Sequence, residues 1–312
     1  LSILKLDNYY DFNYQKFMPS IGISLKRNYY TPEAYAYKDY LTKNGWDVQL
    51  DYEEFLSSKN DITIMFLGVD PVWKKNRFKK IIHDYPSLST GKFPKTKNLV
   101  KKYINRKPDG RIFLNSFVEN EFNFKKCENS ININAGVDSL FFDKVEENKE
   151  YDLVYSGSIL GRDGLISELQ RLAILGLRIL IIGEVDNNLR NYLKLQGDVH
   201  FSGRVKRCEL PGLYRLAKAG LSISPDIYPF NSQTTIKTLE YLASGIGLVS
   251  NHYGWVNQFS DKYNYQPSWT GSLKTKDDFD RFEFSEIDML EFSWGNIFKN
   301  VNFNNFVDSL LS

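Results

Sequence analysis

The sequence has little of what metal sites and disulfide-stabilised folds need. Of its 312 residues, 3 are histidine and 2 are cysteine. Cys127 and Cys208 lie far apart and form neither a metal-binding spacing nor a disulfide framework, which favours a reducing compartment. No apolar run approaches the ~18 residues that cross a bilayer, and the amino-terminal residues show no signal-peptide pattern. We therefore expect a soluble, cytoplasmic protein.

Charge and glycine patterning exclude two further classes. The formal net charge is only +2, so the chain as a whole has no general attraction for nucleic acid. No G-x-G-x-x-G turn follows an expected strand, which argues against a dinucleotide-dependent oxidoreductase. No DxD motif stands where a metal site is expected, so no metal is predicted. Hydrophobic residues make up 42% of the chain, enough for sizeable cores, and the length suggests two domains or one large one.

The second half of the chain alternates short apolar runs with amphipathic segments. The predicted strands are Leu153–Ser156, Leu177–Ile182, Val199–Ser202, Leu221–Ser224 and Gly247–Asn251. The predicted helices are Leu165–Leu175, Asn187–Leu195, Glu209–Lys218 and Ile236–Leu242. Short connections between alternating strands and helices predict a parallel sheet with helices on both faces, hence an α/β fold.

The first half has a weaker pattern. The predicted strands are Ser2–Leu6, Asp47–Leu50, Asp61–Leu67, Arg111–Leu114 and Ser130–Asn134, the predicted helices are Glu33–Asn44 and Thr96–Arg106, and Phe78–His83 is a strand or a helix. The segment from Tyr9 to Tyr30 has no clear period. The charged stretch Asp143–Asp152 is typical of a linker, so we predict domains at residues 1–147 and 148–312, with the last helix able to cross back to the first domain.

The rest of the chain is organised around the segment Ser224–Gly245. Pro225 ends an apolar run, and Thr234 and Thr235 stand where the cap of the next helix belongs. Open parallel sheets bind ligands at the carboxyl ends of their strands, and a helix start offers N–H groups to a phosphate. The segment therefore predicts a phosphate-binding loop, although simple helix capping explains the threonines as well.

Several motifs of this chain resemble those of one enzyme family. They are NAGVDSLFF, YSGSILGRDGL, ILIIGEV, VHFSGRVKRCELPGLYRLAKAGLSISP and KTLEYLASGIGLVSN. In order and spacing they are similar to the family 4-like glycosyltransferases of the GT-B class, over Tyr151–Asn251. The resemblance implies two Rossmann-like domains facing across a cleft, and transfer of a sugar from a UDP-linked donor to a bacterial surface glycan. It also implies retention of anomeric configuration and no cofactor, since the nucleotide sugar is a co-substrate.

The resemblance implies a role for several residues of the second domain. Glu240 would bind the ribose hydroxyls, while Arg162, Lys237 and the helix start at Thr234 and Thr235 would hold the diphosphate. Gly157 and Ser158 would let the backbone approach the phosphates, and Arg204 and Val205 would contact the base. Each has a plainer interpretation, such as a solvated helix face for Glu240 and Lys237. The chain also departs from the pattern, because the first of two family glutamates falls at Ser232 and a lysine usual after the first strand is missing.

Candidates in the first domain are fewer. His83 is placed where the family brings a catalytic or acceptor-side group, although a packed histidine is an alternative. Asp70 and Asp84 end apolar runs and could act as bases if the enzyme inverts. The basic run Lys92–Arg111 could contact anionic lipid headgroups around a lipid-linked acceptor, or could be a solvated amphipathic helix.

Two other functions remain open at this point. A sugar-nucleotide epimerase of the same fold would need acid and base groups around the sugar, and the chain is poor in histidine. A non-catalytic partner that steadies an active transferase would account for the missing glutamate and for the absent glycine pair after the first strand. Release of free nucleotide from UDP-sugars, with and without acceptor, distinguishes these functions.

Overall fold

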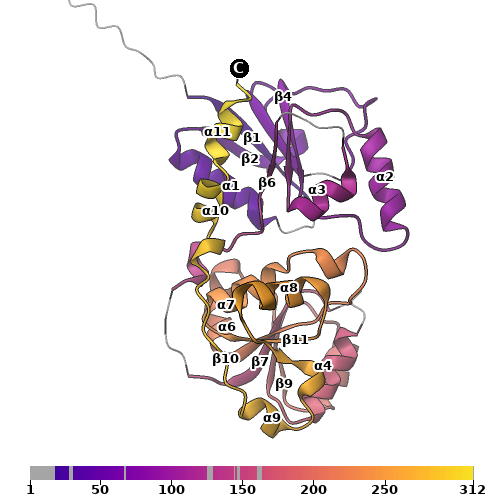
Figure 1. Ribbon diagram of the computed structural model, residues 1–312, viewed down its shortest axis with the longest axis vertical. Coiled ribbons are helices and arrows are strands. Elements are labelled where there is room, and N and C mark those ends of the chain that lie inside the picture. Colours follow the sequence, from indigo (N-terminus) through magenta and orange to yellow (C-terminus); the bar gives the residue numbers. More distant parts are fainter. Residues whose placement is uncertain are drawn as a thin grey trace, which may run out of the picture.

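The computed structural model describes residues 18–27, 31–66, 68–124, 129–143, 145, 148–159 and 164–311. These residues form two lobes, each built on a six-stranded parallel sheet (Figure 1). The strand orders are β2-β1-β3-β4-β5-β6 and β12-β11-β10-β7-β8-β9. The predicted α/β class is confirmed. None of the helices in the described part of the chain has the length and hydrophobicity that crossing a bilayer requires.

The first lobe is a parallel sheet with helices packed against it. Its strands are β1 (Ser20–Leu25), β2 (Asp47–Tyr52), β3 (Ile62–Phe66), β4 (Lys80–Tyr85), β5 (Gly110–Phe113) and β6 (Ser130–Asn132), and its helices are α1 (Pro32–Lys43), α2 (Pro94–Ile104) and α3 (Ser116–Phe122). All five residues of β3 are buried, as expected for a strand covered on both faces. The continuous apolar run of β3 therefore forms part of this lobe's core.

Two elements of the first lobe were not predicted. Strand β1 lies within the segment that shows no sequence period, and α3 follows β5 with Asn115 as its N-cap, whose side chain accepts a hydrogen bond from the backbone N–H of Val118. The strand predicted at Ser2–Leu6 lies outside the described residues. Residues Phe78–His83 proved to belong to a strand that begins and ends two residues later, at Lys80–Tyr85.

The second lobe follows the predicted alternation closely. Its strands are β7 (Tyr151–Ser156), β8 (Ile179–Ile182), β9 (Val199–Gly203), β10 (Ala217–Ser222), β11 (Gly247–Ser250) and β12 (Ser268–Trp269), and its helices are α4 (Leu165–Ile174), α5 (Asn187–Lys194), α6 (Leu210–Arg215), α7 (Ile236–Ala243), α8 (Gly254–Tyr263) and α9 (Lys276–Asp280). Elements α8, β12 and α9 were not predicted. Two adjacent boundaries were wrong, because the predicted helix Glu209–Lys218 ends at Arg215, and the strand predicted at Leu221–Ser224 is β10, which runs from Ala217 to Ser222. Lys218 is compatible with this strand because its ammonium group pairs with Asp152 at 3.0 Å and with Asp280 at 3.1 Å.

The last two helices return to the first lobe. Helices α10 (Trp294–Asn300) and α11 (Phe303–Asp308), at the yellow end of the chain, lie beside α1 (Figure 1). Trp294 is buried in the first lobe's core, and a Cβ atom on Gly136 would come within 2.4 Å of its ring, so this approach requires glycine. Backbone hydrogen bonds from Val137 to Phe292 and from Trp294 to Val137 fix the crossing point.

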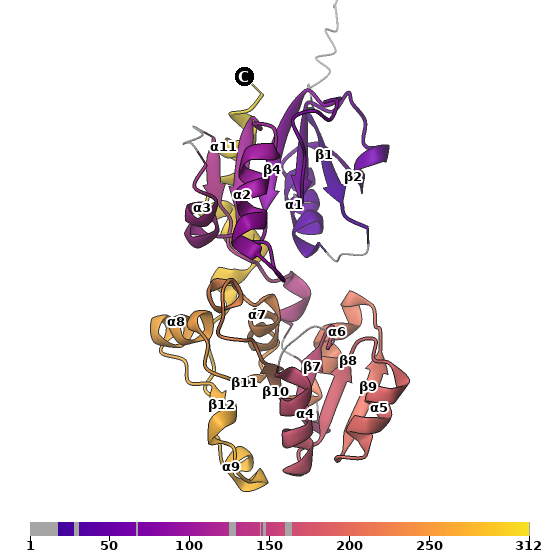
Figure 2. The ribbon, with the colours of Figure 1, turned by 90° about the vertical axis from the view of Figure 1, so that its right-hand side faces the viewer.

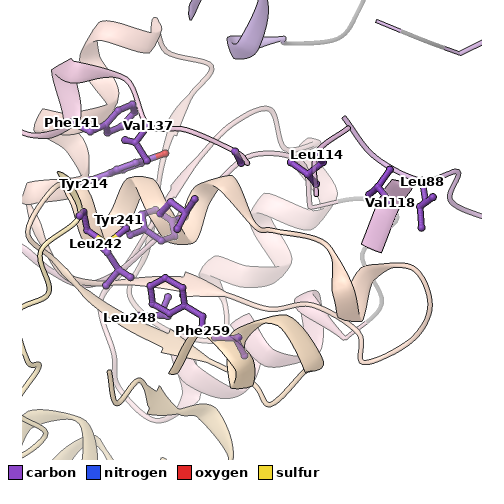
Figure 3. Close-up of a cluster of buried hydrophobic side chains, with 14 of the residues drawn as sticks. Leu88, Leu114, Val118, Val137, Phe141, Tyr214, Tyr241, Leu242, Leu248 and Phe259 are labelled. Atoms are coloured by element: carbon purple, nitrogen blue, oxygen red, sulfur yellow. The ribbon is translucent and has the colours of Figure 1, made fainter. Parts of the chain in front are cut away.

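A hydrophobic cluster connects the lobes at their junction. Phe141 stacks on Tyr214 with ring centroids 5.8 Å apart, and Tyr214 meets Tyr241 edge-on at 4.8 Å. Figure 3 shows Val137 and Phe141 above Tyr214, with Tyr241 below it. The junction is thus packed with aromatic rings rather than bridged by a bare linker.

Candidate functional site

The carboxyl edge of the second sheet brings two predicted residues together. Gly157 follows β7 with a φ of 113°, and a Cβ atom placed on it would meet the Lys237 ammonium nitrogen at 2.7 Å. Lys237 donates a hydrogen bond to the Tyr155 hydroxyl at 3.1 Å and lies 4.3 Å from the centre of that ring. The Ser158 carbonyl accepts a hydrogen bond from the same hydroxyl at 2.8 Å. A cation therefore sits directly above a glycine turn, the arrangement predicted for diphosphate binding.

Helix α7 begins at this edge. Thr235 occupies the N-cap position, but its side chain makes no capping hydrogen bond and instead contacts the Tyr253 hydroxyl at 3.0 Å. Thr234 is half-buried beside it. The plainer interpretation, that a threonine hydroxyl simply caps this helix, is not what the structure shows for Thr235.

Glu240 is more enclosed than the sequence suggested. Its side chain is only 6% exposed, and its carboxylate accepts hydrogen bonds from Arg207 at 3.0 Å and from the Tyr214 hydroxyl at 3.5 Å. Burial raises the pKa of Glu240, and the Arg207 charge opposes that rise. The interpretation of Glu240 as a solvated surface residue is therefore wrong.

Arg207 is a site residue that the sequence analysis missed. It also pairs with Asp138 at 3.4 Å, and its guanidinium lies 5.0 Å from the centre of the Phe141 ring. Asp138 belongs to the end of the first lobe, so Arg207 links the lobes. The signal was present in the neighbouring motifs, which hold Asp138 and Arg207, but sequence alone does not show that they meet.

Glu33 lies in the first turn of α1, in the first lobe. Burial raises its pKa, while the charge of Arg207 lowers it and the charge of Glu240 raises it. Glu33 is therefore a first-lobe carboxyl group on which charges of the second lobe act.

The remaining predicted residues of the second lobe are spread around this edge. Arg204 is exposed and Val205 is half-buried against the junction cluster, just after β9 ends at Gly203. Arg162 lies outside the described residues. Among the side chains that the structure describes, no group of three or more histidine, cysteine, aspartate or glutamate residues is placed to hold a metal ion.

His83 does not lie in the cleft. It is in the interior of β4 with no exposed surface, 3.4 Å from Asp70 and 3.4 Å from the Tyr85 hydroxyl. Burial lowers the pKa of His83, and Asp70 is in turn paired with Arg106 at 2.6 Å. A sugar cannot touch a ring with no exposed atoms, so the position predicted for His83 is corrected and the packed-histidine interpretation is the one that fits. Asp70 belongs to the same buried network.

Asp84 is the second buried carboxyl of β4. It is 2% exposed and accepts a hydrogen bond from the Tyr37 hydroxyl at 2.7 Å. Burial raises the pKa of Asp84 from 3.8 to about 8, with Glu33 adding to the rise and Tyr37 and Lys26 opposing it. Asp84 is therefore mostly protonated at neutral pH and carries little charge.

The protonation of Asp84 makes stability depend on pH. Between its unfolded pKa and about pH 8 the folded state holds a proton that the unfolded state has lost, so the free energy of unfolding falls as pH rises, by up to about 1.4 kcal/mol per pH unit. We expect Asp84→Asn, which keeps the Tyr37 contact, to flatten this dependence and to be more stable than wild type near pH 8. Urea unfolding from pH 5 to pH 8 measures it; parallel curves for both proteins would contradict the assignment.

A large cavity opens at the carboxyl edge of the first sheet. Its volume is about 870 Å³, and it is lined by residues that follow β1, β3 and β4 and by α2. Glu33, in the first turn of α1, is among the residues that line it. Its charged lining residues are Lys26, Glu33, Lys92, Lys97 and Lys101.

The loop of the organising segment touches the first lobe next to this cavity. Tyr228 donates a hydrogen bond to Glu121 of α3 at 2.8 Å and accepts one from Asn98 of α2 at 3.1 Å. Its ring also meets Phe117 edge-on. Seen from the side, α2 and α3 stand above the start of α7 (Figure 2). The two carboxyl edges thus face each other.

Comparison with solved structures finds the same architecture. AviGT4, a glycosyltransferase involved in avilamycin A biosynthesis, matches with a TM-score of 0.63 at 12% identity, over 94% of this chain and 98% of its own. Sucrose-phosphate synthase from Thermosynechococcus elongatus matches with a TM-score of 0.59 at 14% identity, over 95% of both chains. HepE from Anabaena, solved with UDP-glucose, matches with a TM-score of 0.56 at 11% identity, over 94% of this chain and 98% of its own.

This chain has the GT-B fold. The predicted architecture of two Rossmann-like domains facing across a cleft is therefore confirmed. No protein-family model matches the sequence, and no curated protein matches it either. The similarity to these structures shows the fold, in which the edges of two sheets face each other. The chemistry depends on the residues at those edges.

Proposed function

We propose that the protein is a glycosyltransferase that moves a sugar from a UDP-linked donor to a glycan or a lipid-linked acceptor. The observation that carries the proposal is the Lys237 ammonium group over the Gly157 turn, with the buried Glu240 further along the same helix α7 and a cavity of about 870 Å³ at the carboxyl edge of the other sheet. HepE, which shares the fold, was solved with UDP-glucose. A donor on one edge and an acceptor on the other bring the two substrates together in the cleft.

On the donor side, each residue has a distinct task. Lys237 and the start of α7 stabilise the charge that grows on the departing diphosphate, and Gly157 lets the backbone approach it. Glu240 binds the ribose hydroxyls in exchange for its present contacts with Arg207 and Tyr214. Arg204 and Val205 flank the base, with Ser158 beside the phosphates.

The transfer itself is a substitution at the anomeric carbon. An acceptor hydroxyl oxygen forms the new bond to that carbon, the bond to the diphosphate oxygen breaks, and UDP leaves with the electron pair. The hydroxyl proton passes to the departing diphosphate, which fits a retaining reaction without a metal or other cofactor. This mechanism assigns charge stabilisation to Lys237 and requires nothing of His83.

Helix α2, on the acceptor side, suggests how the protein would contact the surface of a membrane. Helix α2 carries Lys95 and Lys102 together with exposed Leu99 and Tyr103. Such a basic helix with exposed apolar residues suits the headgroup region of an anionic bilayer, where a lipid-linked acceptor in bacterial surface polysaccharide synthesis would be presented. The place of action would then be the cytoplasmic face of the membrane.

Nucleotide release tests the function against its alternatives. A thermal-shift screen of UDP-, GDP- and CMP-sugars first identifies the donor, because a ligand that binds only the folded state raises the melting temperature. Acceptor-dependent release of UDP supports transfer. An epimerase would convert the sugar without net release of UDP, and a non-catalytic partner would leave the donor intact.

Replacing Glu240 by glutamine should weaken UDP binding. Glutamine keeps the shape but removes the charge that accepts the ribose protons, and hydrogen bonds to charged groups contribute about 1.5–3 kcal/mol, which is roughly a tenfold to 100-fold change in Kd. Calorimetric titration with UDP measures this change. Glu286→Gln, at an exposed position, is the matched control, and thermal melting of both variants checks the fold. Equal UDP affinity in the Glu240 and Glu286 variants would remove Glu240 from the donor site.

A further inference from the structure

The cavity of the first lobe has an unbalanced charge. Four lysines line it, Lys26, Lys92, Lys97 and Lys101, against a single carboxylate, Glu33. Lys26 comes from the end of β1, and the other three come from α2 and the loop before it. The cations therefore converge on one space from two separate elements of the fold.

Of the four cavity lysines, Lys26 and Lys101 are the two that are most enclosed. No acidic residue in the described part of the chain forms an ion pair with either of them. Lys26 and Lys101 are both half-buried, and neither takes part in a salt bridge there. Burial lowers the pKa of Lys26, and the nearby charge of Lys101 lowers it further. The same happens at Lys101, through burial and then the charge of Lys97.

The carboxyl groups nearest to these lysines do little to neutralise them. Asp84, beneath the cavity, is mostly protonated at neutral pH because its pKa is raised to about 8. Burial also raises the pKa of Glu33, although the charge of Arg207 opposes the rise. A cluster of like charges held without counterions costs free energy, which an anionic ligand would recover.

We propose that this cavity binds the acceptor through a phosphate group, held by Lys26, Lys97 and Lys101. The inference rests on the proposed function, since it names the chemical class of the acceptor in that reaction. Lysine ammonium groups bind phosphate as point charges, and a cavity of about 870 Å³ is large enough to hold a sugar or polyol beside the phosphate. Hydroxyl groups of Ser87, Thr90 and Thr96 line the same space and suit the polar remainder of such a ligand.

The cavity opens at the carboxyl edge of the first sheet, the edge that faces the second lobe. Next to it, Asn98 of α2 donates a hydrogen bond to Tyr228 of the second lobe at 3.1 Å. An acceptor anchored among the lysines can therefore extend its hydroxyl end toward the donor edge. The phosphate itself can belong to a soluble glycan or polyol, or to a lipid headgroup.

Inorganic pyrophosphate is the probe for this site. The donor site is first saturated with UDP, and pyrophosphate is then titrated calorimetrically into wild type, the double variant Lys26→Gln/Lys101→Gln and the control Lys38→Gln/Lys43→Gln. The control removes the same charge from exposed positions on α1 that do not line the cavity. We expect at least a roughly tenfold loss of pyrophosphate affinity in the cavity variant and less than about threefold in the control.

The experiment distinguishes failure of the phosphate site from failure of the proposed transferase function. Equal losses in both variants, or no loss in the cavity variant, would overturn the phosphate site, with melting curves confirming that the variants are folded. Failure of UDP to bind at all would count against the proposed function while leaving the pyrophosphate comparison readable. Binding to phosphatidylglycerol vesicles that falls only in the cavity variant assigns the phosphate to a lipid; vesicle binding that the variant does not change assigns it to a soluble acceptor.

Discussion

Replacing Lys237 by glutamine is expected to lower the rate constant of sugar transfer by roughly 100- to 1000-fold. Removal of one group that stabilises developing negative charge in an enclosed site has an effect of this size. Lys237 lies above the Gly157 turn at the start of α7, where the departing diphosphate would gain charge. The loss should appear mainly in kcat, since the charge on the leaving group is greatest in the transition state.

The controls for Lys237 are chosen by charge and by position. Lys237→Arg keeps the cation and should recover part of the rate. Lys194→Gln, on the exposed side of α5, removes one charge far from this edge and should leave the rate unchanged. A Lys237→Gln enzyme with the wild-type kcat would show that the diphosphate is stabilised elsewhere.

The second lobe was predictable because its elements are short and separated by clear signals. Parallel strands buried on both faces form continuous apolar runs, and the ends of β8 and β11 were predicted to within two residues. Strand β10 was shifted because Lys218 lies in its first half and resembles a helix residue. Its pairing with Asp152 and Asp280 is a long-range contact that no local pattern reveals.

The first lobe was harder for a physical reason. Strand β1 has the sequence Ser-Ile-Gly-Ile-Ser-Leu, in which small and polar residues are buried along with the isoleucines. The strand is buried because it lies between β2 and β3, and its composition alone does not predict a buried strand. Helices α10 and α11 likewise complete the core of a lobe that begins far away in sequence.

The residues of the candidate site also fall into two groups, those within local sequence motifs and those brought together only by the fold. Lys237, Gly157 and Glu240 were predicted as candidates because they stand in motifs that resemble those of the family and have a regular strand-turn-helix spacing. Arg207 was missed because its pairing with Glu240 and with Asp138 joins segments that lie far apart in the sequence.

His83 shows the converse error. A histidine near a strand end is equally compatible with a cleft and with a packed interior. Only the three-dimensional structure shows that Asp70 and Tyr85 enclose it.

Truncation of Phe298 to alanine should be among the most destabilising single changes in the chain. Its ring has no exposed surface and lies 4.7 Å from Tyr40, 5.0 Å from Phe303 and 5.3 Å from Trp294, centre to centre. Removal of a buried aromatic ring costs about 3–5 kcal/mol, from lost burial and from the cavity that remains. Because Phe298 joins α10 to the first lobe's core, the loss should fall on the packing of the carboxyl-terminal helices against α1 and the first sheet.

Urea unfolding followed by circular dichroism measures this cost. Leu290→Ala is the matched control, since Leu290 lies just before α10 in sequence but is 56% exposed, and its truncation should change stability by less than about 0.5 kcal/mol. If both variants unfold at the wild-type urea concentration, the carboxyl-terminal helices are not part of the first lobe's core. A loss confined to Phe298→Ala means that the first lobe needs residues from the far end of the chain to be stable, so the two sheets cannot be separated by cutting between β6 and β7.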